Sequence, residues 1–109
     1  MYVILRRAAW TTLDEVAAAN ARSLAVGAEM DDDVRWIRSY ITTDVGETLG
    51  ALCVYEAISP EALREHAAEA GMRADEIVAV RETVVIRPDP PVSRAPTTLP
   101  ELGQPGYRA

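Results

Sequence analysis

The chain has 109 residues and a formal net charge of -6, a length that suits one domain with a modest core. The acidic charge disfavours nucleic acid and anionic membranes as partners, because both are themselves negatively charged. The sequence contains no lysine, which excludes a Schiff-base lysine and the lysine of a phosphate-binding loop.

The sequence also predicts a cytoplasmic protein. No apolar run approaches the roughly 20 residues that span a bilayer, and residues 2–7, which read YVILRR, do not resemble a signal peptide. The single cysteine, Cys53, excludes an internal disulfide and fits a reducing compartment.

The first half of the chain predicts a strand, a helix and a second strand. Residues 2–8 favour a β-strand. Thr12 is a predicted helix N-cap, with Glu15 three residues later completing a capping box, and Gly27 is the predicted end of this helix. Residues 34–43 alternate in polarity and predict a strand. The predicted core-facing stripe of the helix consists of Leu13, Val16, Ala17, Asn20 and Leu24.

The second half predicts a hairpin, a short helix and a last strand. A polar turn and a strand over residues 48–57 complete the hairpin. Ser59 followed by Pro60 favours a helix start, because serine caps a helix and proline fits its first position. This helix is predicted to end at Gly71. Residues 76–86 are rich in valine and isoleucine and predict a strand.

This order of elements predicts an α+β, ferredoxin-like βαββαβ fold, with a four-stranded antiparallel sheet and both helices on one face. The predicted domain spans residues 1–87. Residues 88–109 hold six of the seven prolines and no periodic apolar pattern, which predicts an extended or disordered tail.

One face of such a sheet is left open, and a large apolar surface is not stable in water. We therefore expect a homodimer in which two sheets pair into a barrel-like assembly. Burying an unpaired charge costs several kcal/mol, so polar side chains on this face should pair with one another or with a ligand. The predicted ligand pocket is formed by Arg6, Arg38, Tyr40 and Glu56. The alternative is that they form ion pairs at a sheet edge or interface, with no ligand.

His66 is the single histidine and falls on the apolar stripe of the second predicted helix. It is a candidate catalytic acid–base or ligand residue, and the alternative is a core residue whose ring forms a local hydrogen bond. His66, Glu56 and Cys53 are the candidate metal ligands, although Cys53 equally fits a buried thiol. One cysteine and one histidine cannot complete a four-ligand zinc site within one chain.

Four short segments resemble a widespread family of small bacterial domains of unknown function, which includes an actinobacterial nickel-binding protein. They are WIRSY from Trp36, CVYEA from Cys53, SPEALREHA from Ser59 and ADEI from Ala74. The resemblance covers roughly residues 2–87 and implies a ferredoxin-like fold and a dimer. It also implies that Asn20, Cys53, Glu56 and His66 occupy positions of the family motif.

Arginines stand where relatives in this family have histidines. The nickel-binding member has histidines in its first strand, where this chain has Arg6 and Arg7, and many relatives have one at the position of Arg38. Nickel prefers imidazole nitrogen, whereas arginine stays protonated and cannot ligate a metal. The arginines instead favour a small anion such as a carboxylate. The sequence therefore predicts a homodimer that binds a small molecule, with no firmly assigned cofactor. The alternatives are a nickel or other transition-metal protein and a cofactor-independent enzyme with His66 as acid–base.

Overall fold

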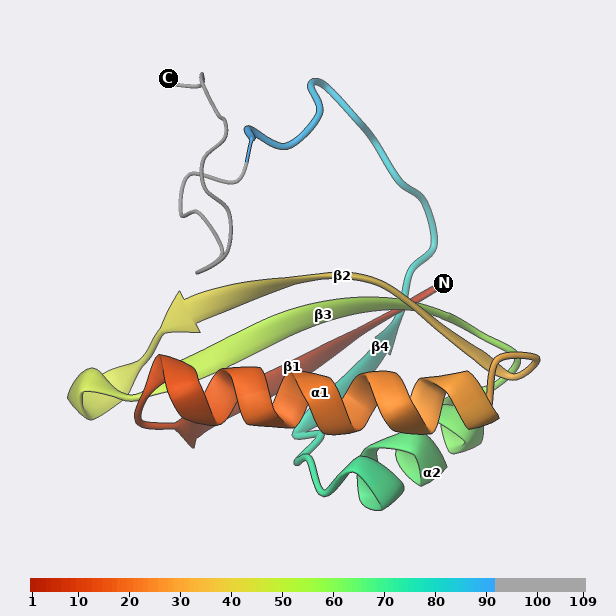
Figure 1. The fold of residues 1–109 in the computed structure, drawn as a ribbon. Coiled ribbons are helices and arrows are strands. Elements are labelled where there is room, and N and C mark those ends of the chain that lie inside the picture. Colours follow the sequence, from red (N-terminus) through yellow and green to blue (C-terminus); the bar gives the residue numbers. More distant parts are fainter. Residues whose placement is uncertain (92–109) are drawn as a thin grey trace.

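The protein is described over residues 1–91 by a computed structural model. Its elements are β1 (Tyr2–Trp10), α1 (Leu13–Glu29), β2 (Val34–Thr43), β3 (Leu49–Ala57), α2 (Pro60–Ala70) and β4 (Glu76–Ala79), with one 3-10 turn at Val45–Glu47. The strands form an antiparallel sheet in the order β2-β3-β1-β4. Both helices lie on one face of this sheet (Figure 1). The predicted α+β, ferredoxin-like fold is confirmed. Within residues 1–91 there is no helix of the length and apolarity needed to cross a membrane.

Helix α1 begins where the sequence predicts and ends later than expected. The Thr12 side chain accepts a hydrogen bond from the Glu15 backbone N–H at 3.2 Å, and the Glu15 carboxylate accepts one from the Thr11 N–H at 2.8 Å. Gly27 does not end the helix. The helix continues to Glu29, and the Met30 N–H then bonds to backbone carbonyls of the last turn. An isolated glycine inside a helix lowers its stability without breaking it.

The inward face of α1 differs from the predicted stripe. Leu13 and Leu24 are exposed, at 51% and 62%, whereas Val16, Ala19 and Ser23 are buried. The helix is therefore rotated so that small side chains face the sheet, which allows the helix axis to approach the strands closely. As a consequence, Ser23 faces the interior in the second half of α1, whereas the adjacent Leu24 faces solvent.

Helix α2 follows the predicted signals at both ends. The Ser59 side chain accepts a hydrogen bond from the Ala62 N–H at 3.1 Å, and Pro60 occupies the first helical position. Gly71 ends the helix in the left-handed region, at φ 67°, where glycine carries no steric penalty. Its buried face packs against the sheet and brings His66 into the interior.

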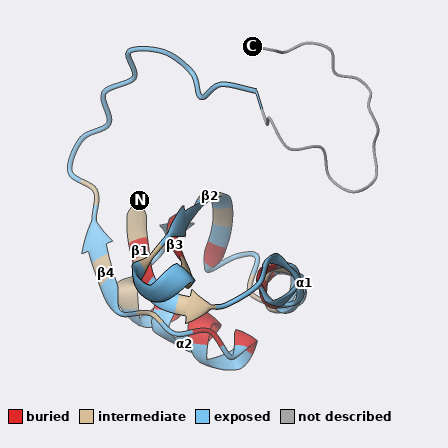
Figure 2. Ribbon diagram, turned by 90° about the vertical axis from the view of Figure 1, so that its left-hand side faces the viewer, coloured by how far each residue is buried: buried red, intermediate tan, exposed pale blue. Residues whose placement is uncertain are grey.

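The main core lies between the sheet and the helices. Ile4 and Cys53 face each other across β1 and β3, and both are buried with Tyr55 and Leu63. Figure 2 shows the buried residues gathered on the inner sides of the strands and helices. Because side chains alternate along a strand, the neighbours of these residues in β1 and β3 lie on the opposite, open face.

The last strand is shorter than predicted. β4 ends at Ala79, which pairs with Tyr2 at the start of β1. The chain then leaves the sheet after one further backbone hydrogen bond, from the Val80 N–H to the Met1 carbonyl. Residues 80–91, here called the arm, have no helix or strand and leave the sheet on the side opposite the helices (Figure 1). The arm returns to the sheet at Asp89, which contacts Arg38 and Tyr40 of β2. The prediction of a disordered tail over residues 88–109 falls mostly on residues 92–109, outside the described residues.

Candidate ligand-binding site

Arg6 lies on the helix side of the sheet and is almost completely buried, with 1% of its surface exposed. It follows Ile4 by two positions in β1 and pairs with Ala51, so it shares the inward face. The prediction that it joins Arg38, Tyr40 and Glu56 on the open face is therefore wrong. Within the described residues, none of its three guanidinium nitrogens has a hydrogen-bond acceptor.

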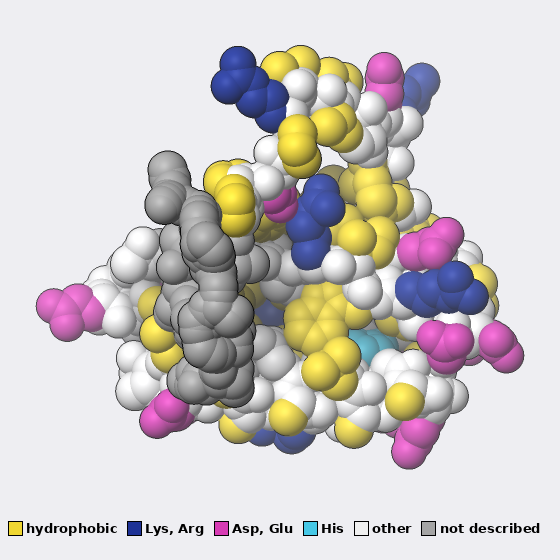
Figure 3. Space-filling view, turned by 45° about the horizontal axis from the view of Figure 1, so that its top comes forward, with side chains coloured by type: hydrophobic (Ala, Val, Ile, Leu, Met, Phe, Trp, Pro, Cys, Tyr) yellow, Lys and Arg dark blue, Asp and Glu magenta, His cyan; other side chains and the backbone are white. Residues whose placement is uncertain are grey.

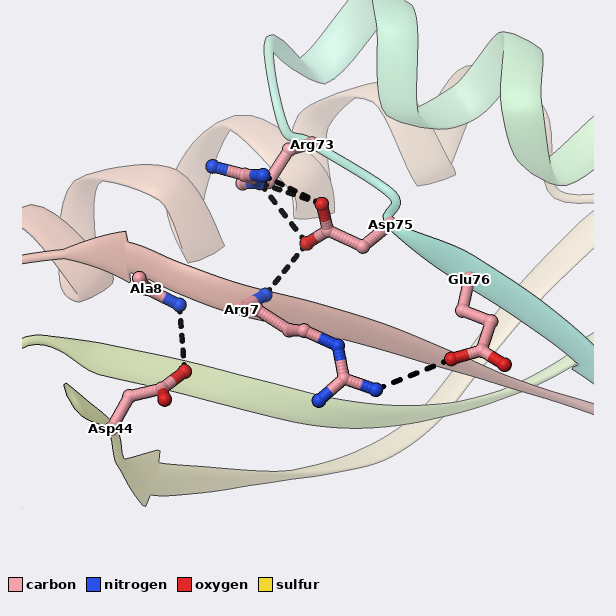
Figure 4. A network of polar contacts seen from close by, with 6 residues as sticks. All are labelled: Arg7, Ala8, Asp44, Arg73, Asp75 and Glu76. Atoms are coloured by element: carbon pink, nitrogen blue, oxygen red, sulfur yellow. Dashed lines mark hydrogen bonds and ion pairs between the residues drawn. The ribbon is translucent and has the colours of Figure 1, made fainter.

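An irregularity in β1 directly after Arg6 is held by two carboxylates (Figure 4). The register between β1 and β3 shifts after Arg6, and Ala8 adopts a positive φ of 46°. Asp75 accepts a hydrogen bond from the Arg7 backbone N–H and Asp44 accepts one from the Ala8 N–H, each at 2.7 Å. These bonds satisfy the N–H groups that the shifted register leaves unpaired and fix the direction in which Arg6 points.

The same hydrogen bonds lower the pKa of both carboxyl groups. For Asp44 the main cause is the bond from the Ala8 N–H. For Asp75 it is the side-chain bond from Arg73, followed by the bond from the Arg7 N–H. Both groups therefore stay ionised at neutral pH and keep the β1 irregularity in place.

Gly50 permits a close approach of β3 to β1 at this point. A β-carbon at position 50 would lie 2.6 Å from the Arg6 carbonyl oxygen and 3.0 Å from an Asp44 carboxylate oxygen. The Arg6 backbone therefore packs closely against Gly50 of β3 at its carbonyl group.

Three other buried polar groups lie near the Arg6 guanidinium. The Arg6 Cζ is 5.9 Å from the centroid of the Tyr55 ring, and the His66 ring meets the Tyr55 ring edge-on at 5.6 Å. The His66 Nε2 is 3.3 Å from the Ser23 carbonyl oxygen. The Ser23 hydroxyl, the Tyr55 hydroxyl and the His66 Nδ1 are buried, and each lacks a hydrogen-bond partner among residues 1–91. These four residues, Arg6, Ser23, Tyr55 and His66, are called the buried polar cluster below.

The pKa values within the cluster reflect its burial. Burial raises the pKa of Tyr55, while the charge of Arg6 opposes this shift. The Arg6 guanidinium and the Ser23 hydroxyl both lie near the Tyr55 hydroxyl without reaching hydrogen-bonding geometry. Burial lowers the pKa of His66, and the charge of Arg6 also lowers it. His66 is therefore neutral at pH 7, and Arg6 is the only group of the cluster that is charged.

A cleft leads from the surface to this cluster. It has a volume of about 380 Å³, lies between α1 and β2, and has Ser23, Trp36 and His66 among its lining residues. In the space-filling view the histidine side chain is visible beside hydrophobic side chains (Figure 3). The Trp36 ring also stacks on Tyr55, at 6.3 Å between centroids. Ser23 and His66 line this cleft, whereas Arg6 and Tyr55 lie behind them and do not line it.

On the open face, two of the predicted site residues lie together and hold a carboxylate of the same chain. The Arg38 Nε donates to the Tyr40 hydroxyl at 2.8 Å, and this hydroxyl donates to the Asp89 carboxylate at 2.7 Å. The Arg38 Nε is itself 3.5 Å from that carboxylate. Glu56 lies on the same face, where it is opposite Arg35 in the register of β2 and β3, and it lines a different pocket.

The three predicted metal ligands do not form one site. Cys53 is a buried thiol on the helix side of the sheet and packs against Ile4 in the core. Glu56 is exposed on the opposite face, while His66 belongs to the buried polar cluster. Across residues 1–91 there is no group of three or more histidine, cysteine, aspartate or glutamate side chains that could hold a metal ion.

Ser23 and Tyr55 were not predicted as site residues. Tyr55 lies in the CVYEA segment and alternates with Cys53 in the same strand, so its inward position could have been inferred from the core. Ser23 gave no signal, because a serine in the middle of a helix usually faces solvent. Asn20, which matches the family motif, lies half-buried on α1 next to the inward-facing Ala19.

The sequence matches the family described as "Nickel responsive protein SCO4226-like" over residues 2–80. The chain belongs to the SCO4226-like family. The crystal structure of SCO4226 from Streptomyces coelicolor A3(2) is similar to this chain, with a TM-score of 0.63 and 27% sequence identity. The match covers 76% of this chain and 98% of that chain. No curated protein matches the chain. The family resemblance that the four short segments indicated is confirmed.

Proposed function

We propose that this SCO4226-like protein binds a small anionic molecule through the buried polar cluster, with the guanidinium of Arg6 as the counter-charge. The observation that carries the proposal is that Arg6 is 1% exposed and has no hydrogen-bond acceptor in the described part of the chain. An unpaired buried cation costs several kcal/mol. A carboxylate of a ligand would offset this cost through charge-assisted, bidentate hydrogen bonds.

The chemistry of the cluster favours an anion over a neutral ligand or a metal ion. Arginine offers five N–H donors and no acceptor. The charged residues that line the neighbouring cleft, Asp31 and Arg35, are both exposed. The cleft volume of about 380 Å³ falls in the lower part of the range of small-molecule sites. It suits a compact organic acid, with Trp36 beside the apolar part of the ligand.

The proposal is tested by calorimetric titration of small carboxylic acids, including propionate and phenylacetate, into the ligand-free protein. Arg6→Gln should lose at least about tenfold in affinity, the loss expected when one charge-assisted pair is removed. The adjacent Arg7→Gln is the matched control, because Arg7 faces the opposite side and bonds to Glu76 at the surface. Failure of every acid to bind, or equal affinity in the Arg6 variant, would refute the proposal.

We also propose that the protein is a homodimer whose open sheet faces meet. Support comes from exposed apolar side chains on this side, including Tyr40 and Val78 on the sheet and Val84–Ile86 on the arm. In the space-filling view hydrophobic side chains gather along the projecting part of the chain (Figure 3). Native mass spectrometry of the untagged protein gives the oligomeric state directly. A monomer at micromolar concentration would refute this part of the proposal.

Nickel binding is a second candidate, because the name of the family describes a nickel-responsive protein. Within one chain the candidate ligands His66, Cys53 and Glu56 do not meet, so such a site would require residues from two copies that meet at the cleft beside His66 and not through the open sheet faces. Nickel titrated into the protein should then bind in proportion to the dimer, and His66→Phe should remove it. An unchanged thermal unfolding temperature in excess nickel would argue against this candidate.

A further inference from the structure

We infer that the ligand carries a hydroxyl group beside its anionic group, so that the site selects a hydroxycarboxylic acid over the corresponding simple acid. This inference rests on the proposed function, since it concerns the same buried polar cluster. It is carried by the geometry around His66, which leaves one ring nitrogen as an acceptor that nothing in residues 1–91 satisfies.

The tautomer of His66 follows from its contact with helix α1. The Nε2 atom lies 3.3 Å from the Ser23 carbonyl oxygen, and a carbonyl oxygen can only accept a hydrogen bond. The Nε2 atom must therefore carry the hydrogen. In a neutral imidazole the other nitrogen, Nδ1, then has a free lone pair and can only accept. The Nδ1 atom is buried and receives no hydrogen bond from the described residues.

A simple anion can satisfy only part of the cluster. Its oxygens would accept hydrogen bonds from the Arg6 guanidinium, which has no acceptor in hydrogen-bonding geometry among residues 1–91. It has no hydrogen to give to the His66 Nδ1, and leaving a buried acceptor unpaired costs about 1–3 kcal/mol. The ligand that completes the site therefore also supplies a donor.

The positive charge of Arg6 decides which kind of donor fits. An ammonium group on the ligand would place a second cation in a buried site that already contains one, and like charges repel strongly where water is excluded. A hydroxyl group donates a hydrogen bond without adding charge. The site should thus prefer hydroxy acids over amino acids as well as over simple acids.

Arg6 and His66 border the same aromatic ring, and a ligand that meets both must enter from the cleft past the side chains of His66 and Ser23, because Arg6 does not line the cleft. The Arg6 Cζ lies 5.9 Å and the His66 ring centroid 5.6 Å from the centroid of the Tyr55 ring. The unpaired hydroxyls of Tyr55 and Ser23 can each donate or accept. These hydroxyls can therefore adjust to the remaining ligand oxygens. The preference for a hydroxy acid depends on the Arg6 guanidinium, which can only donate, and the His66 Nδ1, which can only accept.

The inference is tested with two matched series of ligands, titrated calorimetrically at pH 7.5 into the ligand-free protein. One series is propionate, lactate and alanine, and the other is phenylacetate, mandelate and phenylglycine. Within each series the members differ mainly in a hydrogen, a hydroxyl or an ammonium group at the same carbon. The hydroxy acid should bind at least about tenfold more tightly than either partner, as expected for one buried hydrogen bond.

A His66→Phe variant separates the hydrogen bond from packing, because it keeps a ring and removes the acceptor. It should bind lactate no more tightly than propionate, while Arg7→Gln should keep the full preference. A readout that needs no variant is the ¹⁵N resonance of the ring nitrogens, which belongs to His66 because the chain has one histidine. The Nδ1 resonance should move on addition of lactate and stay in place on addition of propionate.

The outcomes distinguish this inference from the proposed function. If lactate and propionate bind with equal affinity through Arg6, or the Nδ1 resonance moves equally with both, the hydroxyl preference is wrong while anion binding stands. Tighter binding of alanine than of lactate would also overturn the preference. If none of the acids binds, the proposed function and this inference both fail.

Discussion

Replacing Arg6 by methionine should make the ligand-free protein more stable, although it removes a charged residue from the centre of the fold. Arg6 is 1% exposed and its guanidinium has no acceptor within residues 1–91. Its desolvation therefore costs several kcal/mol that no ion pair offsets. Methionine keeps most of the stem, and the smaller side chain leaves a cavity that costs about 1 kcal/mol.

The net expectation for Arg6→Met is a gain of about 1–3 kcal/mol in the free energy of unfolding, within the range measured when buried charges are replaced by apolar residues. For a domain of this size, that raises the melting temperature by roughly 4–8 °C per kcal/mol. Urea unfolding in a buffer free of carboxylates measures the free energy of unfolding of the variant and of the unsubstituted protein. The two values can be compared if their m-values are equal.

The matched control is Arg7→Met, the same substitution one residue further along β1. Arg7 is 63% exposed and its 3.2 Å ion pair with Glu76 lies at the surface, so its removal should change the stability by no more than about 0.5 kcal/mol. A loss of more than about 1 kcal/mol in Arg6→Met would refute the reasoning. It would mean that the guanidinium is already stabilised by partners in the ligand-free protein.

Three further predictions concern stability. Burial lowers the pKa of His66 in the folded state below 6.5, so on acidification the unfolded state takes up a proton at a higher pH than the folded state does. The free energy of unfolding should therefore fall as the pH decreases through about 6.5. His66→Gln should flatten this slope between about pH 6.5 and 5, and a slope that is unchanged would contradict it. Gly50→Ala should destabilise by about 1–3 kcal/mol in urea, because its β-carbon would lie 2.6 Å from the Arg6 carbonyl oxygen; a neutral result would show that β3 can move. Ser59→Ala should cost about 1 kcal/mol through loss of the cap to the Ala62 N–H, and Ser59→Thr should restore most of it in the same assay.

The elements of the fold could be predicted because their signals are local. The serine and proline at the start of α2, the glycine at its end and the alternating strands of the hairpin each depend on a few neighbouring residues. The end of β4 depends on another part of the chain. Val84–Ile86 have high β-propensity, but β4 pairs with β1 only from Glu76 to Ala79, and the following residues leave the sheet.

The placement of the site could not be predicted from alternation alone. In β1 the two faces read Tyr2, Ile4, Arg6 and Val3, Leu5, Arg7, so each has two apolar or aromatic residues followed by an arginine. Periodicity of two cannot say which arginine points inward. That choice is made by the helices, which cover the face of Ile4 and Arg6. The same packing turns Ser23 inward in α1, where the leucines seemed the stronger candidates.

The buried Arg6 also bears on whether nickel, which the name of the family mentions, could bind in the interior of this chain. A guanidinium stays protonated and cannot ligate a metal, and a divalent cation near it would meet strong repulsion in a site shielded from water. A buried cation and a nickel ion are therefore alternatives for the interior beneath α1. The positions around it, Ile4 and Ala51, show that the fold accepts small or apolar side chains on this face, so the architecture does not require a charge here. If Arg6→Met proves more stable, the buried charge of Arg6 lowers stability without serving the architecture, and the proposed anionic ligand gives it a role that nickel cannot.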